Sequence, residues 1–256
     1  MTTSALRLER EGDVLRVTLA RPDRRNALDA ELIRELTDAF AGAGDARAVV
    51  LAGEGPSFCA GADVEWMRAS ADLSYDENVE DARALRRMLE TVDGCPAPVV
   101  ARIQGHALGG GCGLVACADV GIAANDAVFA FSEVKLGIIP AVISPFALAR
   151  IGPGAARRYF LTGERFDAVT ARRIGLVHEV TSADGLDAVV EQVLAEILCA
   201  GPEAVRAAKR LVLDAPLDGE ETARRIAERR TSPEGQEGLR AFLERREASW
   251  RTGPGT

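Results

Sequence analysis

The chain has 256 residues, 47% of them hydrophobic and 27% charged, so it can bury a sizeable core as one large domain or as a domain with a small appendage. No apolar run approaches the roughly 18 residues that cross a bilayer, which predicts a protein that does not span a membrane. The net charge of −8 argues against general nucleic-acid binding, because neutralising phosphates requires a concentrated basic face.

The N-terminal part predicts a hairpin followed by a helix. Its first ten residues alternate like a strand and contain no apolar signal core, so we expect the protein in the cytoplasm. Leu6–Arg10 and Val14–Ala20 flank a Glu-Gly-Asp sequence that is typical of a hairpin turn. Asp29 can cap a helix in which apolar residues recur at helical spacing, namely Leu32, Ile33, Leu36 and Phe40.

Strands and helices continue to alternate along the rest of the chain. We expect strands at Arg47–Gly53, Pro98–Ile103, Val120–Ala123, Val128–Phe131 and Leu176–Val180, and helices at Val79–Val92, Ser144–Arg150, Gly154–Leu161 and Ala168–Arg173. Ser70–Asp81 is acidic and polar, which is typical of a mobile flap or an irregular helix over a binding cleft. Three or four amphipathic helices follow, so we divide the chain into a strand-rich core, residues 1–195, and a helical region, residues 196–256.

Three consecutive glycines lie between the expected strand at Pro98–Ile103 and an apolar helix. Because they lack Cβ atoms, Gly109, Gly110 and Gly111 allow a ligand to approach the main chain, and the free N–H groups of the following helix point toward it. This geometry suits a carbonyl oxygen that becomes an oxyanion. An ordinary tight turn is the alternative interpretation.

Two further segments strengthen the functional interpretation. Ser57–Asp63 is a second loop of small residues between an apolar strand and the start of a helix, so two such loops can each offer an N–H to one oxygen. Glu133 lies in an otherwise apolar segment, where a carboxylate is costly unless something uses or pairs it. An ion pair with Lys135 or with an arginine is the alternative interpretation.

The cysteines and histidines do not indicate a metal site. The five cysteines are scattered without C-x-x-C spacing, and neither of the two histidines has a second ligand near it in the sequence. Cys59 and Cys112 lie in the two loops, where they are either small apolar residues or reactive thiols. We expect no metal and no disulfide framework.

The order of motifs along nearly the whole chain resembles the crotonase family, the enoyl-CoA hydratase/isomerase superfamily. Each motif alone is weak, whereas the ordered set is specific. The motifs are R-N-A-L-D (residues 25–29), F-C-A-G-A-D (58–63), G-G-G-C-G-L (109–114), C-A-D-V (117–120), F-S-E-V-K-L-G-I-I-P (131–140), L-T-G-E (161–164) and I-G-L-V (174–177). The resemblance implies an α/β fold, a crotonase-like spiral of ββα units with a C-terminal α-helical trimerisation region, and a homotrimer or a dimer of trimers.

The resemblance also implies an unsaturated acyl-CoA thioester as substrate, with coenzyme A entering as part of it and no separate cofactor. In the family pattern, the main-chain N–H groups of Ala62 and Gly110 stabilise negative charge on the thioester oxygen, and Glu133 is the acid/base. The other acyl-CoA contacts that the resemblance implies are Arg25, Ala27, Leu28, Ala60, Asp63, Val64, Gly109 and Pro140. Arg25 is alternatively a turn arginine with no ligand.

The chain departs from typical hydratases at Gly113, where they carry a second glutamate. Two carboxylates can hold one water, whereas a single carboxylate is enough to remove a proton at one carbon and return it at another. Enoyl-CoA hydration, double-bond isomerisation without hydration, and CoA-ester binding without catalysis therefore all stay open. Ala141 stands where dienoyl-CoA isomerases carry an aspartate, and Pro140–Phe146 resembles the methylglutaconyl-CoA and isohexenylglutaconyl-CoA hydratase branch.

Overall fold

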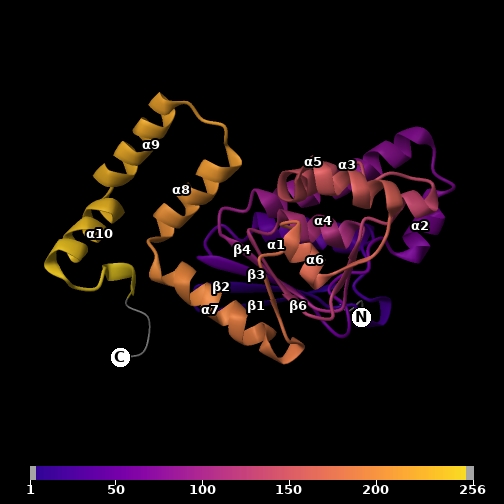
Figure 1. Cartoon of the computed structure of the whole chain (residues 1–256), viewed down its shortest axis with the longest axis horizontal. Helices are drawn as coiled ribbons and strands as arrows, with labels where there is room; N and C mark the ends of the chain where they lie inside the picture. Colours follow the sequence, from indigo (N-terminus) through magenta and orange to yellow (C-terminus); the bar gives the residue numbers. More distant parts are fainter. Residues whose placement is uncertain (1–3, 252–256) are drawn as a thin grey trace.

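The computed structural model describes residues 4–251. In this part of the chain the strands form two sheets, a larger one in the order β1-β2-β3-β4-β6-β9 and a smaller one in the order β5-β7-β8 (Figure 1). The pairs β1–β2 and β7–β8 are antiparallel, and the other pairs are parallel. The strands are β1 (Leu6–Glu11), β2 (Val14–Leu19), β3 (Ala48–Gly53), β4 (Val99–Ile103), β5 (His106–Leu108), β6 (Val120–Ala124), β7 (Val128–Ala130), β8 (Phe166–Asp167) and β9 (Glu179–Thr181).

Helices cover both faces of the larger sheet and extend beyond it (Figure 1). The α-helices are α1 (Ala30–Ala41), α2 (Val64–Ser70), α3 (Tyr75–Asp93), α4 (Gly110–Cys117), α5 (Ser144–Thr162), α6 (Ala168–Arg173), α7 (Leu186–Cys199), α8 (Pro202–Leu213), α9 (Gly219–Thr231) and α10 (Pro233–Glu244). Short 3-10 helices occur at η1 (Pro22–Arg24), η2 (Glu133–Leu136), η3 (Ala183–Gly185) and η4 (Ser249–Arg251).

Alternation along the strands divides the buried residues between the two faces of the larger sheet. On β3, Val49 and Leu51 belong to the main core, together with residues of α1, α3, α4 and α5. Ala48 and Val50 belong to a second core on the opposite face, where α7 contributes Leu186. The sheet is therefore buried on both sides, which is usual for parallel strands.

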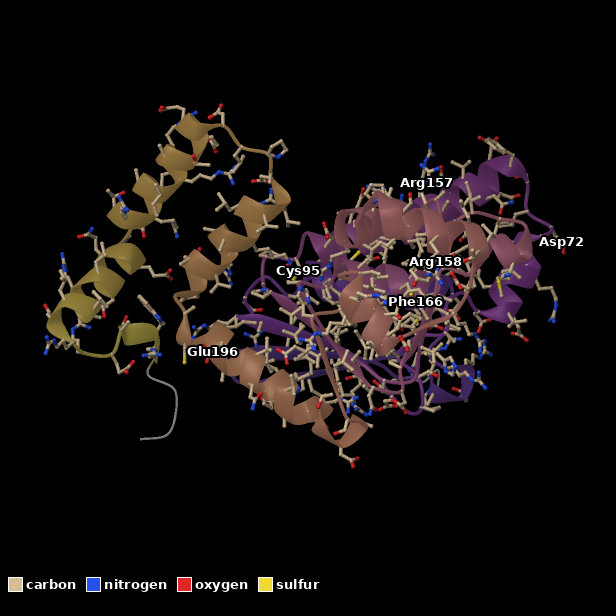
Figure 2. All side chains as sticks on the ribbon, viewed as in Figure 1. Asp72, Cys95, Arg157, Arg158, Phe166 and Glu196 are labelled. Carbon is tan, nitrogen blue, oxygen red and sulfur yellow. The ribbon has the colours of Figure 1, made fainter. Side chains whose placement is uncertain are left out.

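Aromatic rings pack the smaller sheet. Phe166 of β8 stacks on Phe129 of β7, with ring centroids 5.8 Å apart, and lies 4.3 Å from the ring of Tyr159 on α5. Figure 2 shows Phe166 among the crowded side chains of the interior, whereas Glu196 of α7 lies at the outer surface. Because β7 ends three residues before Glu133, this packing fixes the position from which that carboxylate projects.

The predicted hairpin and first helix are confirmed. Glu11 pairs with Val14 across a two-residue turn in which Gly12 has a φ of +57°. At the start of α1, the Asp29 side chain accepts a hydrogen bond from the Leu32 N–H at 2.9 Å. Local turn and cap chemistry therefore sufficed to position both elements.

The prediction for the segment before α3 is wrong in one respect. The segment expected to be irregular as far as Asp81 becomes a regular helix at Tyr75, and the expected start at Val79 is four residues late. Ser74 and Glu77 cause the early start, because each side chain bonds the other's backbone N–H in a reciprocal cap.

Two strand predictions also need correction. The last strand is Glu179–Thr181 rather than Leu176–Val180, because the N–H groups of Leu176 and Val177 donate to the Ala171 carbonyl of α6 and pairing with β6 begins only at Glu179. The strand before the glycines does not run into them directly, because β5 lies between. Gly105, with a φ of +58°, turns the chain from β4 into β5.

The C-terminal helices divide into one that packs on the sheet and three that reach away from it. Residue 195 lies within α7, so the predicted boundary crosses a helix, and separate core and helical units stay a prediction. In Figure 1, α8, α9 and α10 extend away from the strands. On α10, Phe242 is 81% exposed and Leu243 is 78% exposed. No helix within residues 4–251 is long and apolar enough to cross a bilayer.

A buried ion pair joins α8 to the core. The Lys209 ammonium lies 2.7 Å from the Asp119 carboxylate, and the Lys209 side chain is only 6% exposed. The same carboxylate accepts a hydrogen bond from the Val99 N–H at 2.7 Å. The pair therefore connects α8 with the start of β4 and the end of α4.

Replacing Lys209 with Met should destabilise the protein by about 2 kcal/mol, because it leaves Asp119 partly buried without its cation. We expect a loss below that of a fully buried pair, since the Asp119 side chain is 28% exposed. Urea unfolding at fixed protein concentration measures the change. Arg210→Met is the matched control: it removes an exposed pair with Asp214 and should cost under about 1 kcal/mol. Equal losses in the two variants would contradict the assignment.

Candidate active site

The two loops of small residues lie side by side. The Cys59 N–H donates to the His106 carbonyl at 2.9 Å, and the Leu108 N–H donates to the Cys59 carbonyl at 3.0 Å. Gly61 and Gly109 have φ angles of +95° and +49°. A Cβ on Gly61 would lie 2.9 Å from the Leu108 carbonyl oxygen, so this close approach requires glycine.

The segment at residues 25–28 holds the first loop from its other side. The Ala60 N–H donates to the Arg25 carbonyl at 3.0 Å, and the Leu28 N–H donates to the Gly61 carbonyl at 2.7 Å. Asn26 anchors this segment: it is fully buried, and its amide donates to the carbonyl oxygen of Ser57 at 2.8 Å. This anchoring role of Asn26 was not predicted, although the residue lies inside the R-N-A-L-D motif.

Two backbone N–H groups are free at the point where these loops meet. Gly110 is the first residue of α4, so its N–H has no partner within the helix. In residues 4–251, neither the Gly110 N–H nor the Ala62 N–H donates a backbone hydrogen bond. Both residues line the same cavity, which makes their N–H groups candidates for binding one ligand oxygen.

Glu133 projects toward the second of these loops. A Cβ on Gly109 would lie 3.3 Å from Glu133 Oε1, so the glycine makes room for the carboxylate. Glu133 Oε2 is buried and has no hydrogen-bond partner within the described residues. Burial raises the pKa of Glu133 above its ordinary value. A carboxylate held in this way is suited to accept a proton from a ligand.

The local structure and the neighbours of Glu133 test whether it forms a structural ion pair. The residue begins the 3-10 helix η2, three residues after β7 has ended. No ion pair between Glu133 and Lys135 or an arginine occurs in residues 4–251. The alternative interpretation as a structural ion pair is therefore not supported.

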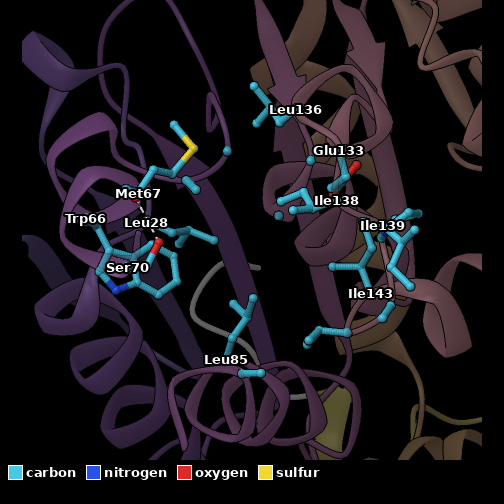
Figure 3. Close-up of a pocket in the computed structure, with 18 of the residues that line it drawn as sticks. Leu28, Trp66, Met67, Ser70, Leu85, Glu133, Leu136, Ile138, Ile139 and Ile143 are labelled. Carbon is cyan, nitrogen blue, oxygen red and sulfur yellow. Dashed lines mark hydrogen bonds between the residues drawn. The ribbon is translucent and has the colours of Figure 1, made fainter. Parts of the chain in front are cut away.

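A cavity of about 330 Å³ connects these groups (Figure 3). One wall comes from α2 and α3, with Trp66, Met67 and Leu85, and the facing wall comes from residues 136–143, with Ile138. The predicted site residues that line the cavity are Leu28, Ala60, Ala62, Gly109, Gly110, Glu133 and Pro140. The structure therefore brings together loops that are up to 112 residues apart in the sequence, from Leu28 to Pro140.

Four predicted contacts lie outside the cavity lining. Asp63 caps α2 by accepting from the Glu65 N–H at 2.9 Å. Ala27 is buried, whereas Val64 and Arg25 are exposed. Their contact with coenzyme A stays a prediction. Asp63 nevertheless has a structural role that the sequence analysis did not assign.

The position of the missing second glutamate is filled by packing. A Cβ on Gly113 would lie 2.6 Å from Ile143 Cγ2 and 3.5 Å from Leu89 Cδ2. Ile143 lines the cavity and is 2% exposed. Asp81 on α3 is the other acidic residue in the lining, and sequence analysis did not single it out.

The thiols near the site are buried. Burial raises the pKa of Cys59 to about 12 and raises that of Cys112 as well, so both side chains are protonated at neutral pH. Cys112 Sγ donates to the Ala107 carbonyl at 2.9 Å. These features favour the interpretation as small apolar residues over that as reactive thiols. Within residues 4–251, no three His, Cys, Asp or Glu side chains cluster as metal ligands would.

Comparison with known proteins identifies the family. The sequence profile of the family "Enoyl-CoA hydratase/isomerase" matches residues 9–253. The chain belongs to this family. It is 34% identical over 255 residues to the crotonyl-CoA hydratase of Syntrophomonas wolfei, with 95% of this chain and 96% of that protein covered.

Solved structures of family members have the same fold. An enoyl-CoA hydratase from Shewanella pealeana is 39% identical, with a TM-score of 0.91 over 96% of each chain. The Pseudomonas aeruginosa protein AtuE is 39% identical, with a TM-score of 0.93 over 96% of this chain and 99% of its own. The predicted α/β crotonase fold is thereby confirmed, and the chain is an enzyme of the crotonase superfamily.

Proposed function

We propose that this enzyme moves the double bond of an enoyl-CoA thioester by proton transfer through Glu133. The observation that carries the proposal is that a single cavity is lined by Ala62, Gly110 and Glu133. The two backbone N–H groups donate no backbone hydrogen bond within residues 4–251, and Glu133 Oε2 has no hydrogen-bond partner there. The substrate supplies coenzyme A as part of the thioester, and the reaction needs no separate cofactor.

The chemistry follows from these groups. The thioester oxygen accepts hydrogen bonds from the Ala62 and Gly110 N–H groups, so the negative charge that develops there is stabilised. Glu133 removes a proton from one carbon of the acyl chain, and the resulting enolate is conjugated with the remaining double bond. The same carboxyl group then returns the proton at another carbon, and the enzyme ends in its starting state.

Isomerisation fits the site better than hydration. Hydration needs a water held beside the double bond, and Ile143 and Leu89 occupy the region where a second glutamate would extend from Gly113. Hydration remains the second candidate, because a relative that is 34% identical is named crotonyl-CoA hydratase. Binding without catalysis is the third, and it would appear as tight acyl-CoA binding with no turnover.

A panel of CoA esters tests the proposal. The purified enzyme is incubated with matched β,γ- and α,β-enoyl-CoA esters of the same chain length, and the products are identified by mass and chromatography. We expect β,γ-esters to convert to α,β-esters faster than water adds to either. Hydroxyacyl-CoA as the main product would favour the hydratase, and no product from well-folded protein would reject both enzymatic proposals.

A pair of substitutions tests why hydration is disfavoured. Gly113→Glu alone should lower isomerase activity, because the new side chain collides with Ile143 and overpacking costs roughly 1–3 kcal/mol. Adding Ile143→Ala makes room, so the double variant should hydrate crotonyl-CoA faster than Ile143→Ala alone does. Hydroxybutyryl-CoA formation measures this gain. No gain in a folded double variant would reject the missing carboxylate as the cause.

We also propose that the enzyme assembles as a homotrimer or a dimer of trimers and acts in the cytoplasm. Support comes from the apolar side chains that α8 to α10 expose, among them Val212, Phe242 and Leu243, because exposed clusters of this kind are usual at interfaces. Burial and the positive charges of Arg165 and Arg25 lower the pKa of His106. Two arginines therefore act on the same side chain next to the site loops, and this supports a contact between Arg25 and a phosphate of coenzyme A.

A further inference from the structure

The charged side chains that line the cavity are all acidic. Among the described residues of the lining, only Asp81 and Glu133 are charged, and no lysine, arginine or histidine is present. Asp81 belongs to a stripe of α3 that faces the cavity at helical spacing, together with Asn78, Ala82 and Leu85. Leu85 projects toward the cavity in Figure 3, one helical turn beyond Asp81.

The cations nearest along the helix point elsewhere. Arg83 forms an ion pair with Glu80 on α3. Arg86 forms an ion pair with Glu90 at 2.7 Å, and its guanidinium lies 4.9 Å from the centre of the Phe146 ring. These arginines do not line the cavity. A negative group inside it would therefore meet Asp81 without a compensating cation from α3.

Asp81 is partly removed from water and lines the same cavity as Trp66. Burial raises the pKa of Asp81, and the interaction of its carboxylate with the Trp66 side chain opposes that rise. The facing wall is apolar and includes Leu136, Ile138 and Ile139, with Ile138 directed toward the cavity (Figure 3).

On the basis of the proposed function, we propose that the cavity selects uncharged acyl chains and that Asp81 excludes chains with a distal carboxylate. Two like charges in a partly desolvated site repel each other, and a second carboxylate would also lose water without gaining a partner. A hydrocarbon chain, in contrast, gains binding free energy when it buries apolar surface against this wall. A cavity with this selectivity would exclude glutaconyl-type acyl chains, which carry a distal carboxylate. The resemblance of Pro140–Phe146 to the glutaconyl-CoA hydratase branch instead favours such a substrate.

Binding of saturated CoA esters tests the proposal independently of catalysis. 3-Methylpentanoyl-CoA and 3-methylglutaryl-CoA differ only in a terminal methyl against a carboxylate. By calorimetry we expect the neutral ester to bind at least about 10-fold more tightly, with a ratio that shrinks as salt screens the repulsion. Equal binding, or tighter binding of the charged ester, would overturn the proposal.

Asp81→Asn assigns the selectivity to this residue. It should lower the ratio at least about fivefold by improving binding of the charged ester, because the amide keeps the shape without the charge. Asp76→Asn, an exposed change in the first turn of the same helix, is the control and should leave the ratio unchanged. A ratio that does not respond to Asp81→Asn in folded protein rejects the role of Asp81.

Turnover separates this proposal from the proposed function. The unsaturated counterparts of the two esters are assayed with wild-type enzyme and with Asp81→Asn. If neither ester reacts while the binding ratio holds, the proposed function fails and the selectivity stands. If both react equally well and the binding ratio is near one, the proposed function stands and the selectivity fails.

Discussion

Glu133→Gln should lower kcat by at least about 10³-fold and leave the dissociation constant of a saturated acyl-CoA nearly unchanged. The amide preserves the shape of the side chain beside Gly109 and cannot accept a proton. No second carboxylate extends from Gly113 to substitute for it. Steady-state turnover of the most active ester, together with calorimetric binding, measures the two effects separately.

The same substitution should abolish a titration in the pH profile. Glu133 must be ionised to remove a proton, so kcat/KM should fall as the pH drops through its pKa. Burial raises that pKa, which means that the fall should occur above the ordinary range of a glutamate. Glu164→Gln makes the same chemical change at a surface ion pair with Arg158 and should alter neither kcat nor the profile. Unchanged turnover in Glu133→Gln would move the base elsewhere.

Local sequence signals predicted the scaffold of the site. The Asp29 cap, the glycine turn of the first hairpin and the apolar strand at Ala48–Gly53 are each specified by neighbouring residues. The S-x-x-E spacing of Ser74 and Glu77 is typical of a reciprocal cap and also indicates where α3 starts. The predicted start was nevertheless four residues late, because the polar composition of the segment favoured an irregular structure.

Contacts between segments that are distant in the sequence could not be predicted from it. Nothing near Gly113 in the sequence indicates that Ile143 fills the space beside it, because that contact depends on how α4 packs against α5. The orientation of Asp81 is a similar case. A polar residue on an amphipathic helix is usually assigned to solvent, and only the position of α2 turns this face of α3 into a cavity wall.

Gly110 tests the other half of the proposed chemistry, the pair of main-chain donors. Gly110→Pro should reduce kcat/KM by about 10²- to 10³-fold, because it removes one N–H from the developing oxyanion and such donors contribute roughly 3–4 kcal/mol. Proline is compatible with the first position of a helix, and Gly110 begins α4, so the fold should tolerate the change.

The steric effect of the new side chain must be separated from the loss of the donor. A Cβ at this position would lie 2.7 Å from Leu28 Cδ1, so any substitution displaces Leu28 at the cavity wall. Gly110→Ala introduces the same Cβ and keeps the N–H, and it is therefore the matched control. We expect the alanine variant to retain most of the kcat/KM that the proline variant loses, with similar melting temperatures for both. Equal losses of kcat/KM would assign the damage to Leu28 and contradict the role of the Gly110 N–H.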